Sequence, residues 1–245
     1  MSNRSNPFFM RITGAYALFT SADSRGGGEK FSYFVPTREA LRGMADAIYW
    51  KPTFVNVIDE VRVMKPIRTF TSGINTMVDN GTGRDLHYYT YLRDVEYLVK
   101  FHFEWDLNRE DLAGDRNMGK HTAIMVRSLE KGGRFDLFLG VRECIGHAEY
   151  IREEEYESMK GHYDQEEEIS FGIMFSHFDY PKNEDDVFQS VFEPIVMRHG
   201  RITYRPYEDY TIKHQLTAYA YKSPDLKKGV DEEEREYLEM EGGVQ

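Results

Sequence analysis

The run from Val95 to Trp105 limits what this chain can fold into more than any other feature of its sequence. Large apolar residues stand at every second position, and the positions between them are mostly polar. A period of two sends successive side chains to opposite faces of a β-strand. The run therefore predicts the clearest strand of the chain, with an apolar face made of Val95, Tyr97, Val99, Phe101, Phe103 and Trp105.

Two elements are predicted ahead of this strand. The stretch from Phe9 to Ser21 is rich in aromatic and β-branched residues and predicts a first strand. A helix opens at Pro36 and carries one apolar stripe. It has to end by Lys51, because Pro52 disfavours helical geometry in the residue before it. Tyr49 and Trp50 are therefore expected in its last turn.

Further strands and a second helix are predicted on both sides of the central strand. Residues 54–67 predict a strand rich in Val and Ile, and Gly, Asn and Asp punctuate an inserted loop or hairpin over about 69–84. After the central strand, residues 120–131 predict a helix that stops at Gly132-Gly133. Residues 135–141 predict one more strand.

This order of elements predicts an α+β fold. Strand, helix, strand, strand, helix, strand is the ferredoxin-like β-α-β-β-α-β unit, the topology of RNA-recognition domains. We expect this unit over residues 1–148, followed by an acidic connection with a small antiparallel β extension over 149–222. The extension has strands at 169–178, 187–198 and 201–205, with a tight turn at His199-Gly200. Residues 223–245 are expected to form an acidic tail.

Composition narrows the class of protein. A single cysteine, Cys144, excludes an internal disulfide and a cysteine-rich zinc site, which fits a reducing compartment. The chain carries no run of signal-peptide or membrane-spanning character. We therefore expect a soluble cytoplasmic protein with no membrane partner.

The charge of the chain is unevenly distributed. The net charge is −11, yet residues 1–148 hold 20 Lys and Arg against 18 Asp and Glu, whereas residues 149–245 hold 11 against 24. The acidic runs at 149–168 and 231–241 are typical of a solvated helix face or loop. The first part can still carry a basic patch, because nucleic-acid binding depends on local clustering of charge.

Lys120 and His121 are the candidate chemical residues. They follow Gly119 at the start of the predicted second helix. A histidine beside a cation can move a proton near a phosphate, since its charge changes near neutral pH and the ammonium attracts the phosphodiester. Taken alone, the pair is more typical of a solvated lysine and a helix-start histidine than of a catalytic site, and Tyr49 is more typical of packing at a helix end.

Other catalytic patterns are missing from the sequence. The eight histidines show no H-E-x-x-H spacing, and no G-x-S-x-G appears. The Gly26–Gly28 run lacks nucleotide-binding spacing and is as consistent with a flexible connection as with a phosphate-backbone contact. No metal and no cofactor are expected.

Several segments resemble the subtype I-C (Dvulg) CRISPR-associated proteins that process precursor CRISPR RNA, the catalytic "d" branch of the fifth Cas family in the RAMP superfamily. The resemblance covers about residues 8–222 in order. Its motifs include Gly14-Ala-Tyr-Ala-Leu-Phe-Thr20, Gly27-Gly-Glu-Lys-Phe-Ser-Tyr33, Val35-Pro-Thr37, Ala47-Ile-Tyr-Trp-Lys-Pro-Thr53, Val57-Ile-Asp-Glu-Val-Arg-Val-Met-Lys-Pro66, Tyr89-Thr-Tyr-Leu-Arg-Asp94, Asp115-Arg-Asn-Met-Gly-Lys-His121, Arg127-Ser-Leu129 and Phe138-Leu-Gly-Val-Arg-Glu-Cys144.

The resemblance implies metal-independent cleavage of the repeat RNA at the base of its hairpin, with Tyr49, Lys120 and His121 as catalytic residues. Attack by the RNA 2′-hydroxyl would leave a 2′,3′-cyclic phosphate; which residue is the acid and which the base stays open. The product would stay bound in the type I-C interference complex beside other subunits, and related members also bind duplex DNA. The strongly acidic stretch at 149–168 departs from the pattern of the family and argues against RNA contacts in that region.

Basic residues near these motifs are the expected RNA-backbone contacts, although each is equally consistent with a solvated charge: Arg25, Lys30, Lys51, Arg116, Arg127 and Arg134. The alternative function is a non-catalytic scaffold that holds the RNA handle or duplex DNA within the same complex.

Overall fold

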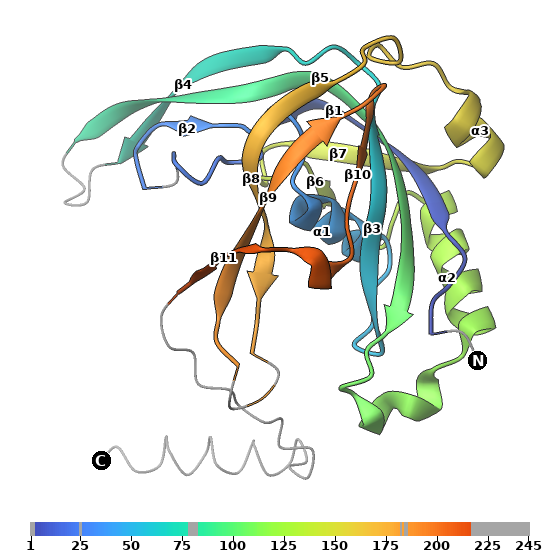
Figure 1. Cartoon of the computed structure of the whole chain (residues 1–245). Coiled ribbons are helices and arrows are strands. Elements are labelled where there is room, and N and C mark those ends of the chain that lie inside the picture. The colour runs from blue at the N-terminus through green and yellow to red at the C-terminus, as the bar shows by residue number, and fades with distance from the viewer. Residues whose placement is uncertain (1–2, 25, 78–82, 182, 184–185, 217–245) are drawn as a thin grey trace, which may run out of the picture.

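The computed structural model describes residues 3–24, 26–77, 83–181, 183 and 186–216 (Figure 1). The elements in this part of the chain are β1 (Phe8–Ala17), β2 (Lys30–Phe31), α1 (Arg38–Ile48), β3 (Phe54–Val63), β4 (Thr69–Met77), β5 (Arg84–Trp105), the 3₁₀ turn η1 (Glu110–Asp115), α2 (Met118–Glu130), β6 (Leu137–Phe138), β7 (Ile145–Tyr150), α3 (Glu153–Ser158), β8 (Ile169–Asp179), β9 (Gln189–Met197), β10 (Arg201–Thr203), the 3₁₀ turn η2 (Tyr207–Asp209) and β11 (Ile212–Gln215). No helix in these ranges is long and apolar enough to cross a membrane.

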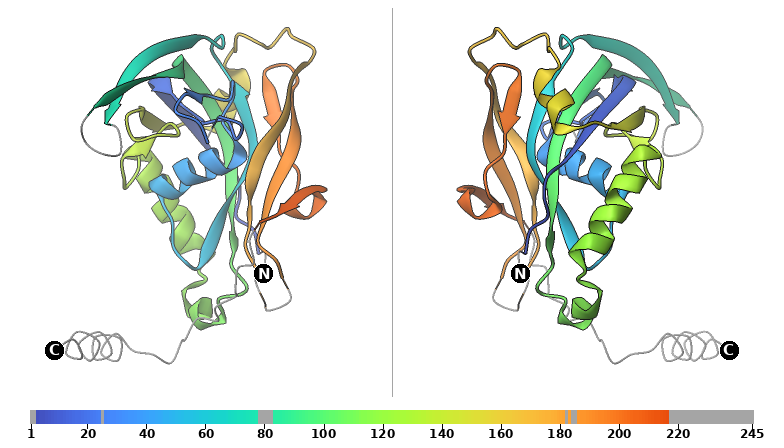
Figure 2. Two further views of the ribbon diagram at one scale, coloured as in Figure 1. Left: turned by 90° about the vertical axis from the view of Figure 1, so that its left-hand side faces the viewer. Right: turned by 90° about the vertical axis from the view of Figure 1, so that its right-hand side faces the viewer.

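A large antiparallel sheet forms the centre of the molecule. Its strands lie in the order β10-β3-β5-β1-β7-β6, and each neighbouring pair is antiparallel. The predicted strand at 95–105 is confirmed as the inner half of β5, which pairs with β1 on one side and β3 on the other. Its apolar face is buried under α1 and α2, which cover the same side of the sheet (Figure 2).

The outer half of β5 contributes only Tyr91 and Leu92, at its inner end, to the buried residues of this core. Residues 84–92 pair with β4, so that the two strands extend beyond the main sheet as a hairpin arm (Figure 1). The prediction of an insertion over 69–84 is therefore confirmed, as a hairpin. Asp94, with φ +52°, lies where the arm joins the sheet.

The helices α1 and α2 each begin at a residue whose side chain caps the first turn. Thr37 accepts a hydrogen bond from the Ala40 amide, and Asn117 accepts one from the Lys120 amide, which starts α2 two residues before the predicted position. The prediction that Tyr49 lies in the last turn of α1 is wrong. Tyr49 has extended backbone geometry (φ −162°) and follows the helix, which directs the chain toward β3.

The predicted strand at 135–141 is wrong in extent. Only Leu137–Phe138 pairs, because Gly140 turns the chain at φ +95° against Leu18, whose carbonyl oxygen would be 2.1 Å from a Cβ at this position. The strand that pairs with β1 on the edge opposite β5 is β7, and β7 crosses the predicted boundary between residues 148 and 149. The division into 1–148, 149–222 and 223–245 stays a prediction, and residues 217–245 lie outside the described ranges.

The predicted C-terminal strands are confirmed, but they divide between two sheets. β8, β9 and β11 form a separate three-stranded sheet, whereas β10 joins the edge of the large sheet at β3. The predicted turn is also confirmed: His199 and Gly200 both have positive φ, as a two-residue hairpin turn requires.

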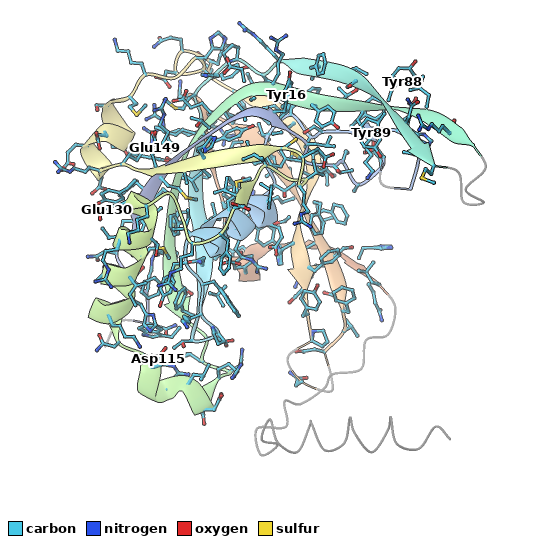
Figure 3. All side chains as sticks on the ribbon, turned by 180° about the vertical axis from the view of Figure 1, so that it is seen from behind. Tyr16, Tyr88, Tyr89, Asp115, Glu130 and Glu149 are labelled. Carbon is cyan, nitrogen blue, oxygen red and sulfur yellow. The ribbon has the colours of Figure 1, made fainter. Side chains whose placement is uncertain are left out.

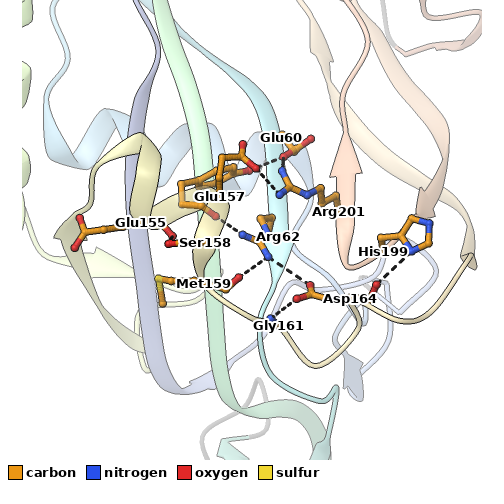
Figure 4. Close-up of polar contacts among 11 residues, drawn as sticks. Glu60, Arg62, Glu155, Glu157, Ser158, Met159, Gly161, Asp164, His199 and Arg201 are labelled. Carbon is orange, nitrogen blue, oxygen red and sulfur yellow. Dashed lines mark hydrogen bonds and ion pairs between the residues drawn. The ribbon is translucent and has the colours of Figure 1, made fainter.

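The acidic connection is tied to the sheet by arginines (Figure 4). Arg62 on β3 is buried and donates to the carbonyl oxygens of Tyr156 and Met159, the latter at 2.7 Å. Arg201 on β10 bridges Glu60 at 2.8 Å and Glu157 at 2.7 Å. Part of the acidic excess at 149–168 therefore pairs with neighbouring arginines on the sheet.

Candidate active site

The fold brings Tyr49 and His121 together from the two helices on the same side of the sheet. The hydroxyl of Tyr49, which follows α1, lies 2.8 Å from Nδ1 of His121 in the first turn of α2. Both side chains are fully buried. The contact depends on the sheet placing the end of α1 beside the start of α2, since 72 residues separate the two positions.

The hydrogen bonds of the imidazole fix its tautomer. Nε2 lies 2.8 Å from the carbonyl oxygen of Asp115, which can only accept, so Nε2 carries the hydrogen. In the neutral imidazole, Nδ1 is then an acceptor and receives the hydrogen of the Tyr49 hydroxyl. In this tautomer, a hydrogen bond joins the phenolic O–H of Tyr49 to the acceptor nitrogen Nδ1.

An aromatic cage surrounds the imidazole. The rings of Phe54, Phe103 and Trp105 meet His121 edge to face, with centroids 5.3, 6.3 and 5.6 Å away. Removal from water disfavours ionisation, and burial raises the pKa of Tyr49 above its ordinary value. The phenol is therefore neutral at physiological pH.

Lys120 is the cation of the site and extends from its solvent side. Its ammonium pairs with the carboxylate of Asp115, while half of its side-chain surface stays exposed. Asp115 also accepts a hydrogen bond of 3.0 Å from Thr53 and lies 3.3 Å from Nε2 of His121 (Figure 3). The Lys120 hydrogen bond lowers the pKa of Asp115, and the same bond raises the pKa of Lys120.

Asp115 and Thr53 were not among the candidates proposed from the sequence. Both stand inside motifs that carry the family resemblance, Asp115 five residues before Lys120 and Thr53 four residues after Tyr49. Nothing in the residue order indicates that these side chains meet, because η1 and β3 bring them together. Among the described residues, no group of three or more His, Cys, Asp and Glu side chains is arranged to hold a metal ion.

Among the residues that the structure describes, the predicted RNA contacts do not form one cluster around this site. Arg134 lies against the site, with its guanidinium 4.5 Å from the centroid of the Tyr49 ring, and Lys51 is exposed nearby. Arg127 is exposed on α2, and Lys30 lies over the ring of Tyr89 on the hairpin arm.

Arg116 has a structural partner set. It donates to the carbonyl oxygens of Asp106 and Arg109, both at 2.9 Å, and so holds the turn that ends in Asp115. Arg25 lies outside the described residues. The role of all six basic residues stays a prediction.

This chain is similar to a known protein family over most of its length. The family model Cas_Cas5d, described as CRISPR-associated protein (Cas_Cas5), matches residues 9–205. A CRISPR pre-crRNA endoribonuclease Cas5d of Mannheimia succiniciproducens is 30% identical over 166 residues, which cover 58% of this chain and 72% of that protein.

Two solved structures share the fold. A protein of Streptococcus mutans described as functionally uncharacterized is 46% identical, with a TM-score of 0.74, and a crystal structure of a CRISPR-associated protein is 43% identical, with a TM-score of 0.73. Each match covers 86% of this chain and 98% of the other. On the extent of the family match and these relatives, the chain belongs to the Cas5d family of CRISPR-associated proteins.

Proposed function

We propose that this protein is an endoribonuclease that cleaves precursor CRISPR RNA within its repeat and thereby matures the guide RNA. The name of the Mannheimia relative supports the substrate class. The observation that carries the proposal is the 2.8 Å hydrogen bond between Tyr49 and His121, with the Lys120 cation adjacent to it. This arrangement supplies both proton transfer and charge stabilisation.

The reaction that these groups fit is attack by the RNA 2′-hydroxyl on the neighbouring phosphorus. The 2′-hydroxyl has to lose a proton, and the pentacoordinate phosphorane gains negative charge. The expected products are a 2′,3′-cyclic phosphate and a 5′-hydroxyl. Metal-independent cleavage is part of the proposal, because one imidazole, one phenol and one ammonium are sufficient for these steps.

The geometry favours His121 as the proton acceptor and Tyr49 as the group that meets the RNA. When the 2′-hydroxyl donates its proton to the Tyr49 oxygen, the phenolic hydrogen moves along the existing hydrogen bond to Nδ1. The bond between phosphorus and the 5′-oxygen breaks, and this leaving oxygen takes up a proton from water. The carbonyl of Asp115 holds the imidazole in the required tautomer. Positioned acid–base catalysis of this kind contributes about 10²–10⁴-fold.

Lys120 stabilises the charge that develops on the phosphorane oxygens. In the resting structure its ammonium is occupied by the Asp115 carboxylate, an anion held against both Lys120 and His121. We infer that this carboxylate occupies the position that a phosphate oxygen takes when RNA binds. RNA has to displace the Asp115 carboxylate from Lys120 before cleavage.

The fold assignment is part of the same proposal. The order β3-β5-β1-β7, with α1 and α2 on one side of the sheet, supports a ferredoxin-like unit in which the end of α1 and the start of α2 carry the catalytic residues. Continued binding of the product within the type I-C complex, contact with its other subunits and binding of duplex DNA are also proposals for this chain.

The alternative is a non-catalytic scaffold for the RNA handle or duplex DNA. One observation favours it: Tyr49 and His121 have no exposed surface, and Lys120 is neutralised by Asp115. A site closed in this way binds RNA without cutting it unless Asp115 moves.

The deciding experiment is a single-turnover cleavage assay with the repeat RNA of the same locus in excess chelator. Wild-type protein is expected to cut at one position and leave a cyclic phosphate, detected by mass spectrometry of the 5′ fragment. His121→Ala and Tyr49→Phe are expected to lower the rate constant while RNA affinity stays within a few-fold. Activity that requires added Mg²⁺ would contradict the mechanism, and binding without cleavage would establish the scaffold.

A further inference from the structure

An open cavity lies beside Tyr49, and the proposed reaction assigns no role to it. It has a volume of about 580 Å³ and lies between the segments that follow the two helices. Trp50 and Lys51 come directly after α1, and Arg134 and Phe135 come shortly after α2. The helix α1 supplies the rest of the wall with Gly43, Asp46 and Ala47.

The loop that presents Phe135 is held firmly. Gly133 turns the chain at φ +111°, with a Cβ at this position only 3.1 Å from Ile48 Cδ1, so a side chain would strain the turn and crowd α1. The amides of Arg134 and Phe135 then both donate to the carbonyl oxygen of Ala47, at 3.2 and 3.1 Å. The cavity wall is therefore a built feature that joins the ends of both helices.

The two aromatic side chains of the wall are displayed to solvent. Trp50 is 51% exposed and Phe135 is 71% exposed. The Phe135 amide is held by its hydrogen bond to Ala47, and the residues on both sides of Trp50, Tyr49 and Lys51, have backbone hydrogen bonds to Ala45 and Phe54. Exposed aromatic rings with free faces bind planar groups, and every nucleobase offers such a face. Their position favours a ligand that stacks.

The charges of the wall favour a ligand that also carries phosphate. The Lys51 side chain is exposed in this wall, and the Arg134 guanidinium lies over the Tyr49 ring, so that Arg134 connects the wall to the candidate site. Asp46 has the opposite effect. Its half-buried carboxylate, which accepts a 2.8 Å hydrogen bond from Asn56, repels phosphate from the α1 wall and can accept from a base N–H. The wall therefore orients a nucleotide, with its base toward α1 and its phosphate toward Arg134.

We propose that Trp50 and Phe135 form a stacking site for the base of one unpaired RNA nucleotide next to the cleaved bond, with Lys51 and Arg134 on its phosphates. The inference rests on the proposed function, since it takes RNA as the ligand of this face. It assigns to the unpaired nucleotide a role in placing the scissile phosphate beside Tyr49. A protein partner on the same aromatic pair is the competing occupant.

The test measures the affinity of the full-length protein for repeat RNA with a 2′-deoxy nucleotide at the cleaved position, which blocks cleavage. A set of these RNAs carries one abasic nucleotide at each unpaired position beside the hairpin. Trp50→Ala and Phe135→Ala are expected to weaken binding of the unmodified RNA by about 5- to 100-fold, the range of one stacked base. Trp50→Phe should recover most of the affinity. Phe70→Ala, which removes a 42% exposed ring on β4, is the matched control and should bind as wild type.

One abasic position should reproduce the loss in wild-type protein, and Trp50→Ala should cause no further loss on that RNA. Equal weakening on every RNA, or unchanged affinity in both alanine variants, would overturn the stacking site. So would variants that bind RNA normally but no longer associate with the other complex subunits, since the face would then be a protein contact. Wild-type protein that shows the single abasic effect but never cuts the 2′-hydroxyl RNA keeps the stacking site and rejects the proposed nuclease.

Discussion

Two cation–carboxylate contacts in this molecule have similar chemistry and opposite surroundings. Lys120 and Asp115 meet at the candidate active site, where half of the lysine side chain is open to solvent (Figure 3). Arg62 meets Asp164 at 3.4 Å behind β3, where only 4% of the arginine side chain is exposed (Figure 4). The carboxylate on Lys120 can be exchanged for an anionic ligand, whereas burial of Arg62 prevents such an exchange.

The partners of the two cations explain this difference. Arg62 donates to backbone carbonyls in the last turn and at the C-terminal end of α3, so its removal leaves these oxygens without a donor. Lys120 has a carboxylate partner on a surface turn, and water can replace either member. In these two contacts, burial therefore separates a structural cation from one that can exchange its anion.

The largest expected effect is the loss of the buried cation. Arg62→Ala should lower the free energy of unfolding by about 3–5 kcal/mol, because it leaves Asp164 and two backbone carbonyls without their donor. Urea denaturation followed by circular dichroism measures this. The folded fraction of Arg62→Ala should cleave RNA at the wild-type single-turnover rate. A stable Arg62→Ala protein would remove the contrast between the two contacts.

The reverse pattern is expected at the exchangeable contact. Lys120→Ala should lower the cleavage rate constant by about 10²–10³-fold, as for removal of one group that stabilises transition-state charge. Its stability should change by about 1 kcal/mol or less, since exposed ion pairs contribute little. Lys131→Ala, at the other end of α2, is the control with an exposed lysine and should leave the rate unchanged. Equal loss of rate in both variants would point to general electrostatic binding.

A smaller effect is expected when the competing anion is neutralised. Asp115→Asn keeps the backbone carbonyl that orients His121 but removes the charge that occupies Lys120. RNA affinity should rise by about two- to five-fold, the value of one exposed ion pair. Filter binding in the Lys120→Ala background provides the control, because there Asp115→Asn has no lysine to release. Weaker binding of Asp115→Asn in the wild-type background would contradict displacement by phosphate.

The smallest effect concerns the alkaline limb of the pH–rate profile. Burial raises the pKa of Tyr49 and the Asp115 hydrogen bond raises the pKa of Lys120, so both groups keep their protons beyond their ordinary values of about 10. The single-turnover rate with protein below saturation, which reports the ionisation of the free protein, should therefore stay level from pH 8 to pH 10 and decline only above that range. Because Asp115→Asn removes the cause of the lysine shift, its decline should begin at lower pH. A wild-type decline centred below pH 9 would contradict the protonated roles of both residues.

The order of the main elements as far as α2 was predictable, because each follows from a local pattern. The alternation at 95–105 identified the inner half of β5, and the glycine pair at 132–133 marked the end of α2. Boundaries failed where a distant contact decides the geometry. Gly140 turns the chain because Leu18 lies behind it, and this neighbour is invisible in the sequence around residue 140.

The candidate site also has some features that the sequence determined and others that only the tertiary structure decided. The sequence alone determined which chemical groups are available, since Tyr49, Lys120 and His121 stand in segments that resemble one family, and it determined the strands and helices that carry them. Only the tertiary structure decided that Nδ1 of His121 faces the Tyr49 hydroxyl, that Asp115 occupies Lys120, and that Trp50 meets Phe135 in one open wall. The physical reason is that each of these contacts joins elements far apart in the chain or on separate turns. Their distance is set by the packing of helices on the sheet, and local propensity carries no information about it.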